Sequence, residues 1–247
     1  MTRASEKPAG YLPLHWWRLR RSVGRRWREW RLPQGFERLG TRYGGWWVYA
    51  PALGAEPLLI DCGLGRDISF PAAFLARFGG QVIGIDPNPQ ALDYARAHCP
   101  VGMAIRGEAF WRDAGQTLRF HLPRPPEQLP QGADGVSGSL LASHSYAGDA
   151  MIEVRTTSLA EILDDAGRDE CDVLKLDIEG AEYEVLQALC TCGAIARARQ
   201  VLIEFHHHCT DHTLQDTLDA AARIQASGFR LAHTEDRNYI FIRRDIG

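Results

Sequence analysis

The chain has 247 residues, of which 45% are hydrophobic and 24% charged, and its formal net charge is −3. This length and composition are typical of one soluble α/β domain with additions. No apolar run approaches the roughly 20 residues that a membrane-spanning helix needs, and no signal-peptide core stands at the N-terminus. The six cysteines form no CxxC pair and no zinc-ligand spacing, so we expect a reduced protein in the cytosol.

The basic charge is concentrated in residues 1–31, which hold nine Arg or Lys against two Glu. Within 14–31, apolar side chains recur at three- and four-residue steps with arginines between them, which predicts a basic amphipathic helix. These side chains are Trp16, Leu19, Val23, Trp27 and Trp30. We therefore predict a Trp/Arg-rich helical extension over 1–45 and a main domain over 46–247. The helix can cap that domain, make a peripheral contact with an anionic membrane surface, or bind an anionic partner or substrate.

The first part of the main domain predicts a strand–loop–helix–strand unit. The apolar run 58–62 predicts a buried strand that breaks into a glycine loop, and a helix follows that loop. A second buried strand is expected over 81–86, before a helix over 90–98 that Asn88 can cap. Such a unit is typical of nucleotide-binding α/β folds, in which ligands bind at the carboxyl ends of the strands.

The glycine loop carries an Asp-x-Gly-x-Gly pattern made of Asp61, Gly63 and Gly65. The third glycine of a dinucleotide fingerprint is absent, and an Asp two residues before the first glycine is foreign to that fingerprint. S-adenosylmethionine fits better, because Asp61 can reach the amino group of its methionine part while Asp86 accepts hydrogen bonds from two ribose hydroxyls. Pro87 and Asn88 complete the expected cofactor site. An NAD(P)-dependent oxidoreductase of the Rossmann type is the alternative.

Residues 123–150 are rich in Pro, Gly, Ser and Gln, and we predict a long loop or lid there. An unstructured stretch of this length inside a compact domain is usually functional or mobile. Its segment 143–146 can form part of a lid or a substrate wall. A strand over 152–156 and a helix over 159–166 are expected after it.

The central motif runs from Val173 to Leu186. An apolar run with one Lys ends at Asp177 and Glu179, and after Gly180 the apolar period changes from that of a strand to that of a helix. A strand buried on both faces therefore leads directly into a helix. Because ligands bind at the carboxyl ends of such strands, Asp177 and Glu179 are candidate site residues, whereas Glu182 fits an acid favoured by the helix dipole.

The next apolar strand is expected over 200–205, and it places Glu204 and His206 beside the acids of the central motif. A long helix begins near Asp211, and 229–234 with 238–243 predict a closing hairpin. Alternating strands and helices followed by an antiparallel hairpin predict an α/β fold: a doubly wound, Rossmann-like, mostly parallel sheet.

The segment Leu174–Glu182, LKLDIEGAE, resembles the signature of the FkbM-type methyltransferases. Other features agree in order, so that the resemblance covers roughly residues 55–243: the segments 60–63, 84–89, 154–163, 202–206 and 239–242. It implies a class I methyltransferase fold and S-adenosylmethionine-dependent transfer of a methyl group, most often to a hydroxyl on a sugar, glycan or natural product. One departure is that the family usually has Gly-Ala-Asn-x-Gly in the first loop, where this chain has Gly63-Leu64-Gly65-Arg66-Asp67.

A sugar hydroxyl ionises far above neutral pH and needs a base or a metal beside it. We expect Asp177 or His206 to act as that base, and Glu179 and Glu204 to orient the substrate. The same four side chains can alternatively hold a divalent cation. A methyltransferase-like binding domain without catalysis is a further alternative. We expect a small-molecule or glycan acceptor and no nucleic acid; the sequence identifies neither the acceptor nor the oligomeric state.

Overall fold

The computed structural model describes residues 34–129 and 135–246, and the chain divides into two units, 1–36 and 37–247. The helix expected over 14–31 lies outside the described residues and stays a prediction. Strand β1 (Phe36–Leu39) pairs with β2 (Trp46–Tyr49), so the described end of the expected extension contains a strand. Among the described residues, no helix is both long and apolar enough to cross a membrane.

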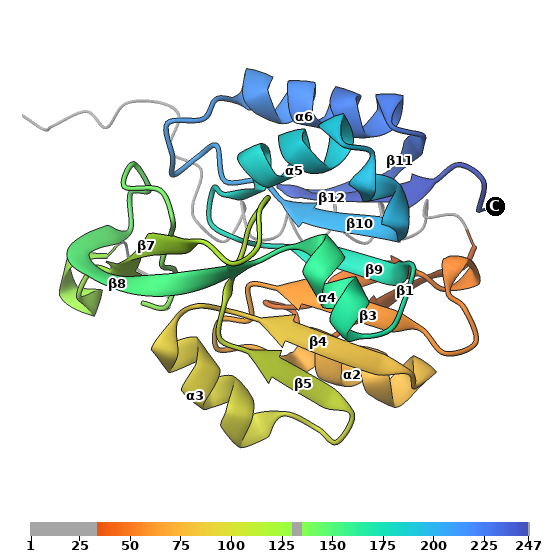
Figure 1. Cartoon of the computed structure of the whole chain (residues 1–247), viewed down its shortest axis with the longest axis horizontal. Coiled ribbons are helices and arrows are strands. Elements are labelled where there is room, and N and C mark those ends of the chain that lie inside the picture. The colour runs from red at the N-terminus through yellow and green to blue at the C-terminus, as the bar shows by residue number, and fades with distance from the viewer. Residues whose placement is uncertain (1–33, 130–134, 247) are drawn as a thin grey trace, which may run out of the picture. The chain divides into compact units, whose positions relative to one another are not determined.

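The second unit is built on a mixed sheet in which seven strands of the described chain follow the order β11-β12-β10-β9-β3-β4-β5 (Figure 1). The strands from β5 to β10 in this order are parallel to one another. The bounds are β3 (Leu58–Cys62), β4 (Gln81–Ile85), β5 (Met103–Arg106), β9 (Cys171–Leu176), β10 (Ala198–Glu204), β11 (Phe229–Glu235) and β12 (Asn238–Arg243).

The last two strands form the C-terminal hairpin at one edge of this sheet. β12 runs antiparallel to both β10 and β11, and Phe241 of β12 lies opposite Val201 of β10. In the turn, Asp236 adopts a φ of 54°, a left-handed conformation that Asp tolerates better than most residues. A mostly parallel sheet that ends in an antiparallel hairpin confirms the predicted fold class.

Helices cover both faces of the sheet. In Figure 1, α4 lies in front of β9 and β3, whereas α2 lies behind β4. Asn88 caps α3 as predicted, because its Oδ1 accepts a hydrogen bond from the backbone N–H of Gln90 at 2.9 Å. The bounds are α2 (Ser69–Phe78), α3 (Pro89–His98), α4 (Leu159–Asp165), α5 (Glu182–Thr191) and α6 (Leu214–Ala226).

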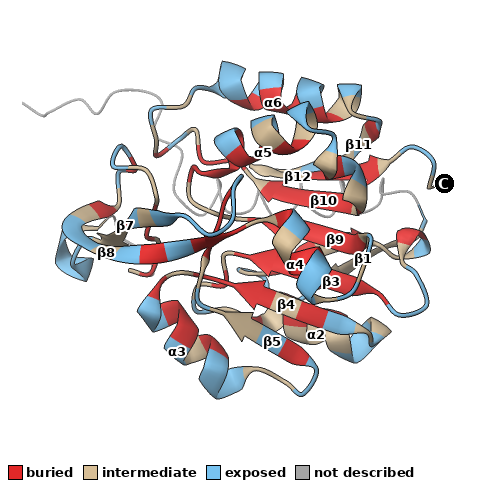
Figure 2. Ribbon diagram, in the orientation of Figure 1, coloured by how far each residue is buried: buried red, intermediate tan, exposed pale blue. Residues whose placement is uncertain are grey.

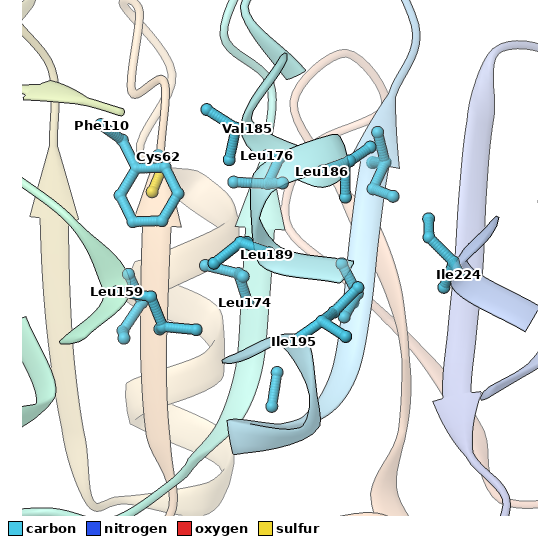
Figure 3. Packing of buried hydrophobic residues seen from close by; sticks show 14 of the residues in the cluster. Cys62, Phe110, Leu159, Leu174, Leu176, Val185, Leu186, Leu189, Ile195 and Ile224 are labelled. Atoms are coloured by element: carbon cyan, nitrogen blue, oxygen red, sulfur yellow. The ribbon is translucent and has the colours of Figure 1, made fainter. Parts of the chain in front are cut away.

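The core lies around the two central strands, β3 and β9, in which every residue is buried (Figure 2). Figure 3 shows Leu174 and Leu176 of β9 close to Leu159 of α4 and Leu189 of α5. A parallel strand covered by helices on both faces buries successive residues rather than alternate ones. This is why the central motif reads as a continuous apolar run in the sequence.

A smaller sheet is inserted between β5 and α4, and in the described chain it has the order β6-β8-β7. Its strands are β6 (Ala109–Phe110), β7 (Thr117–Pro123) and β8 (Ala147–Thr157). The predicted loop over 123–150 is therefore wrong at its C-terminal end, because β8 begins at Ala147 and pairs there with Pro123. The residues 149–151 are all exposed, so no apolar alternation marks this half of the strand in the sequence.

The middle of that predicted loop is anchored to its surroundings. Residues 135–146 are held on one side by a β-bridge between His121 and Ser139. On the other side, the Nδ2 group of Asn88 donates a hydrogen bond to the carbonyl of Val136 at 2.7 Å. The small sheet and the β4–α3 junction thus fix the position of this segment relative to the ends of the parallel strands.

The glycine loop packs directly against the end of β9. The backbone N–H of Asp177 donates to the carbonyl of Cys62 at 3.0 Å. Gly63 has a φ of +88°, and a Cβ at this position would lie 1.8 Å from the carbonyl oxygen of Asp177. Glycine is therefore required at position 63 both by conformation and by space. Gly65 also has a positive φ, +54°, but a Cβ there would meet nothing within 4 Å.

Replacing Gly63 with alanine should destabilise the protein much more than the same change at Gly65. We expect Gly63→Ala to lower the free energy of unfolding by about 2–6 kcal/mol, because backbone strain and an overpacked contact add. Gly65→Ala, which meets only the backbone strain, should cost about 1 kcal/mol. Urea-induced unfolding of both variants measures the difference. Equal losses would show that β3 and β9 are not held this closely at Gly63.

Candidate active site

Side chains from the carboxyl ends of β9 and β10 meet at one edge of the sheet. Because these strands are parallel neighbours, with Ile203 opposite Leu176, the residues that follow them lie side by side. The Nε2 atom of His206 is 3.5 Å from Oδ1 of Asp177 and 3.5 Å from Oε2 of Glu179. The structure therefore brings together the acids of the central motif and the histidine after β10, as the strand order led us to expect.

Asp177 is surrounded by charges of both signs. Burial of its carboxyl raises the pKa, the Lys175 ammonium 3.6 Å away lowers it and Glu204 raises it again, which gives a pKa of about 7. The side chain nevertheless keeps 28% of its surface exposed, so a bound molecule can reach it. A carboxyl group that titrates near neutral pH can take a proton from a reacting group and release it again.

His206 is buried among carboxylates. Burial lowers the pKa of its imidazole, but the negative charges of Glu179, Glu182 and Asp177 outweigh that effect and raise the pKa well above the usual value. Its Nδ1 atom lies 3.1 Å from Oε1 of Glu182, on the side opposite the site. At neutral pH His206 is therefore an imidazolium rather than a free base.

Glu182 is the buried anchor of this histidine, a role that the sequence analysis missed. Its side chain has no exposed surface. Oε2 accepts a hydrogen bond from the N–H of Gly180, and Oε1 accepts one from the backbone N–H of His206, both at 2.8 Å. An acid in the first turn of a helix is usually solvated, and its burial here depends on residues that follow β10, more than 20 positions away. Only the strand pairing reveals that contact.

Segment 135–146 supplies a second histidine that the sequence analysis did not assign. His144 is buried, and its Nε2 lies 2.8 Å from Oε2 of Glu179. The hydroxyl of Ser139 donates to the carbonyl of Glu179 at 2.7 Å. Glu179 has a φ of 53°, a strained conformation for a residue other than glycine. Burial raises its pKa, but His206 and His144 lower the pKa to about 2, so Glu179 stays ionised.

Glu204 faces the same site from the end of β10. Its Oε1 atom is 3.2 Å from the guanidinium of Arg237, which comes from the turn of the C-terminal hairpin. The Glu204 side chain is 23% exposed. Glu204 is thus the outer acid of the group, with a cation that partly offsets its charge.

Asp61, which the sequence analysis placed in the cofactor site, forms a buried ion pair with Lys175. Its side chain is almost fully buried, and Oδ1 lies 2.8 Å from the Nζ atom of Lys175. The same ammonium donates a hydrogen bond to the carbonyl of Gly63 at 2.6 Å. Asp61 is therefore turned toward Lys175 beneath the glycine loop. It binds the ammonium that in turn binds the carbonyl of the glycine loop, and its contact with a cofactor stays a prediction.

The side chain of Asp86 holds the glycine loop by accepting hydrogen bonds from the backbone of that loop. Its Oδ2 accepts hydrogen bonds from the N–H groups of Leu64 and Gly65, and its Oδ1 accepts one from Asn88. Since a carboxylate has about four acceptor positions, one is left for a ribose hydroxyl rather than the two that we expected. The Asn88 side chain is taken up by its cap on α3 and its bond to Val136.

The loop fits S-adenosylmethionine at two points. The space around Gly65 is open, so a ligand can approach its backbone closely, and Asp86 keeps one acceptor position at the tip of β4. Pro87, half-buried, follows Asp86 directly. Gly65, Asp86 and Pro87 are therefore the residues of the predicted cofactor site that remain available to a ligand, while Asp61, Gly63 and Asn88 shape it.

Two groups in the described chain offer three metal-ligand atoms within 4.8 Å of one another: His144, Glu179 and Cys209, and Asp177, Glu204 and His206. In the first, Nδ1 of His144 accepts a hydrogen bond from the N–H of Tyr146, so the proton is on Nε2, the atom that faces Glu179. In the second, two carboxylates and an imidazole suit a divalent cation, but His206 would have to lose its Nε2 proton.

The comparison with protein families gives one match that spans most of the chain. The model described as "Methyltransferase FkbM domain" matches residues 61–231. That range contains the glycine loop, Asp86, the central motif and the end of β10. It also contains the inserted three-stranded sheet with segment 135–146.

Curated relatives and solved structures are more distant. "Probable methyltransferase-like protein 24" of Rattus norvegicus and of Homo sapiens are each 28% identical over 102 residues, 37% of this chain. The match spans 28% of the length of each of these relatives. The METTL16 methyltransferase domain has a TM-score of 0.42 at 9% identity, covering 76% of this chain and 60% of that chain. A TehB-like SAM-dependent methyltransferase from Corynebacterium glutamicum has a TM-score of 0.36 at 12% identity, covering 93% and 95%.

Removing the Lys175 ammonium should destabilise the protein strongly and specifically. We expect Lys175→Met to lower the free energy of unfolding by about 3–5 kcal/mol, because Asp61 is left as an unpaired buried charge. Adding Asp61→Asn to this variant should recover part of the loss. Urea-induced unfolding of the two single variants and the double variant gives the coupling energy. Additive losses would show that the two side chains do not form an ion pair.

Proposed function

Since the chain belongs to the FkbM family of S-adenosylmethionine-dependent methyltransferases, we propose that it methylates a hydroxyl group of a sugar, a glycan or another polyhydroxylated natural product. The observation that carries this proposal is Asp177, a partly exposed carboxyl with a pKa of about 7 beside the glycine loop. A hydroxyl acceptor needs such a base, whereas an acceptor that is already an anion does not.

The charge of the site supports an acceptor without negative charge. Glu179, Glu204 and Glu182 surround Asp177 and His206, and Asp61 lies behind them. The cations Lys175, His206 and Arg237 are fewer than these carboxyl groups and offset only part of their charge. A carboxylate or phosphate acceptor would meet like charges at short distance, which is unfavourable in a partly buried site. A neutral polyol instead offers hydroxyl donors to these acceptors.

The geometry favours Asp177 over His206 as the base. His206 carries protons on both ring nitrogens, because carboxylates face it on both sides, so it has no lone pair with which to accept a proton. Asp177 is ionised in an appreciable fraction of molecules at neutral pH and can reach a bound molecule. Glu179, held in place by His144 and Ser139, can accept a hydrogen bond from a second hydroxyl of the acceptor and so orient it.

When bound, S-adenosylmethionine would supply a methyl group attached to a sulfonium sulfur. The acceptor oxygen would attack the methyl carbon in line with that sulfur, which is the leaving group. Gly65 and Asp86 are the residues that would hold the cofactor at the end of β3 and β4. The contribution of the chain is then to place the acceptor oxygen opposite that sulfur and to remove its proton, and positioning accounts for much of such a rate enhancement. Because position 63 is a glycine, the loop packs directly against the backbone carbonyl of Asp177, so the loop and Asp177 are adjacent.

The acceptor class can be tested directly. We expect tritium from S-adenosylmethionine labelled in its methyl group to appear in one or more members of a panel of methyl hexopyranosides, and not in the matched deoxy sugar that lacks the methylated hydroxyl. Prolonged treatment with EDTA should leave the rate unchanged, because His206 is protonated where a cation would bind it. Transfer to amines in place of hydroxyls would contradict the proposal, and a rate lost with EDTA and restored by Mg²⁺ or Mn²⁺ would replace the base by a metal.

Asp177→Asn should lower kcat by about 10²–10⁴-fold, the usual contribution of a general base. In the unchanged protein the rate should rise as the pH passes about 7, because Asp177 must lose its proton before it can accept another. This rise should be absent from the residual activity of the variant.

Calorimetry supplies the control for this variant. The affinity for S-adenosylmethionine should be the same in Asp177→Asn, in the unchanged protein and in Glu184→Gln, whose side chain is about half exposed on α5. Activity of Asp177→Asn equal to that of Glu184→Gln would remove Asp177 from the mechanism. No binding of S-adenosylmethionine to the unchanged protein at millimolar concentration would instead indicate a non-catalytic domain.

A further inference from the structure

Glu182 has contacts that exceed those of a helix-capping acid. Its two oxygens accept three N–H groups in total: the backbone of Gly180, the backbone of His206 and Nδ1 of the His206 ring. The side chain is fully buried, so no water competes for these positions. A buried carboxylate is stable only when such donors compensate its charge.

The protons on His206 follow from these contacts. An ionised carboxylate only accepts hydrogen bonds, so Glu182 requires a proton on Nδ1. On the other side of the ring, Nε2 lies 3.5 Å from Asp177 and 3.5 Å from Glu179, which are acceptors when ionised. Glu182 thus binds both the backbone N–H of His206 and the Nδ1 atom of its ring, and the N–H at Nε2 points into the site.

The remaining neighbours of His206 do not reverse this arrangement. The His144 ring, with its centroid 6.4 Å away, is itself bound to Glu179, and the His208 ring lies 6.0 Å away. The Sγ atom of Cys209 contacts the backbone carbonyl of His206 rather than its ring. Burial, Arg237 and His206 together lower the pKa of His208 to about 4, so His208 is neutral at pH 7. The carboxylates facing His206 are Asp177, Glu179 and Glu182, and Glu204 also has an oxygen within 4.8 Å of a ring nitrogen.

We propose that Glu182 is a positioning residue that holds His206 as an imidazolium whose Nε2–H binds the acceptor oxygen while Asp177 takes the proton of that oxygen. This inference rests on the proposed function. In the step, the acceptor O–H proton passes to Asp177, an O–C bond forms to the methyl group and the methyl–sulfur bond breaks. The product is a methyl ether, and no further reactant is needed. The N–H of His206 stabilises the negative charge that develops on the oxygen as its proton leaves.

The test is the titration of His206 in the whole 247-residue chain, followed by NMR of ¹⁵N-labelled histidine. Long-range ¹H–¹⁵N spectra distinguish a doubly protonated ring from either neutral form, and His206→Asn assigns the signal. We expect both nitrogens of His206 to be protonated at pH 7 in the unchanged protein. In Glu182→Gln the ring should lose a proton at a pH at least about one unit lower, a tenfold change in proton affinity, because the carboxylate charge is gone.

Two further variants separate positioning from folding. Glu184→Gln, on the exposed side of the same helix, should leave the His206 titration unchanged. Glu182→Asp keeps the charge and should keep the His206 ring doubly protonated at pH 7, so it serves if Glu182→Gln does not fold. A neutral His206 at pH 7 in the unchanged protein, or the same titration in Glu182→Gln as in Glu184→Gln, would overturn the inference.

The second part of the test measures the kinetics of methyl transfer to the sugar that accepts the tritiated methyl group. Glu182→Gln should lose kcat with little change in the affinity for S-adenosylmethionine, and its rate should begin to fall at a lower pH on the alkaline side. A kcat and pH profile equal to those of Glu184→Gln would overturn the role of Glu182 in the reaction. The NMR measurement needs no turnover, so its result stands even if the acceptor proves not to be a hydroxyl.

Discussion

The ammonium of Lys175 connects the glycine loop, the proposed cofactor side of the site, to Asp177 on the proposed acceptor side. It lies 2.8 Å from Asp61, donates to the carbonyl of Gly63 at 2.6 Å and stands 3.6 Å from Asp177. Since Lys175 is almost completely buried, these oxygens compensate its charge in place of water, and the loss of one of them would leave a buried charge uncompensated. The same ammonium lowers the pKa of Asp177 against the effects of burial and of Glu204. The position of the glycine loop and the proton affinity of the proposed base therefore depend on one side chain.

Charges of alternating sign cross the site from Asp61 through Lys175, Asp177 and His206 to Glu182. Each cation lies between two carboxyl groups. The acids at the two ends are buried, Asp61 almost and Glu182 completely, and each contacts a cation, whereas Asp177 in the middle keeps part of its surface exposed. A substrate can therefore reach Asp177, whereas the outer acids are held in buried contacts with their partners. Asp177, with a pKa of about 7, is the carboxyl group of this row that lies open to a ligand.

The sequence predicted what depends on strand order and failed where a distant partner decides. Asp177 and His206 could be grouped because parallel strands end at one edge of a sheet, and the continuous apolar run of the central motif indicated a strand buried on both faces. The ion pair between Asp61 and Lys175 was not predicted, because the two residues lie more than 100 positions apart and nothing local shows that Asp61 points inward. Glu182 was interpreted as a helix-start acid for the same reason. His144 lies in a stretch without periodicity, so its approach to Glu179 had no signal in the sequence.

The first loop departs from the usual family pattern at positions after Gly63, where the structure accommodates other side chains. The fixed position is Gly63, which a neighbouring carbonyl restricts to glycine, and this residue is retained. The changed residues have partners of their own: Leu64 is buried and packs toward Gly84, and Asp67 accepts the N–H of Ser69 at the start of α2. Asp86 then holds the loop through backbone N–H groups, which any residue except proline can supply. The anchor of the loop is therefore independent of its side chains, so the unusual sequence is compatible with a loop that still presents Gly65 to a ligand.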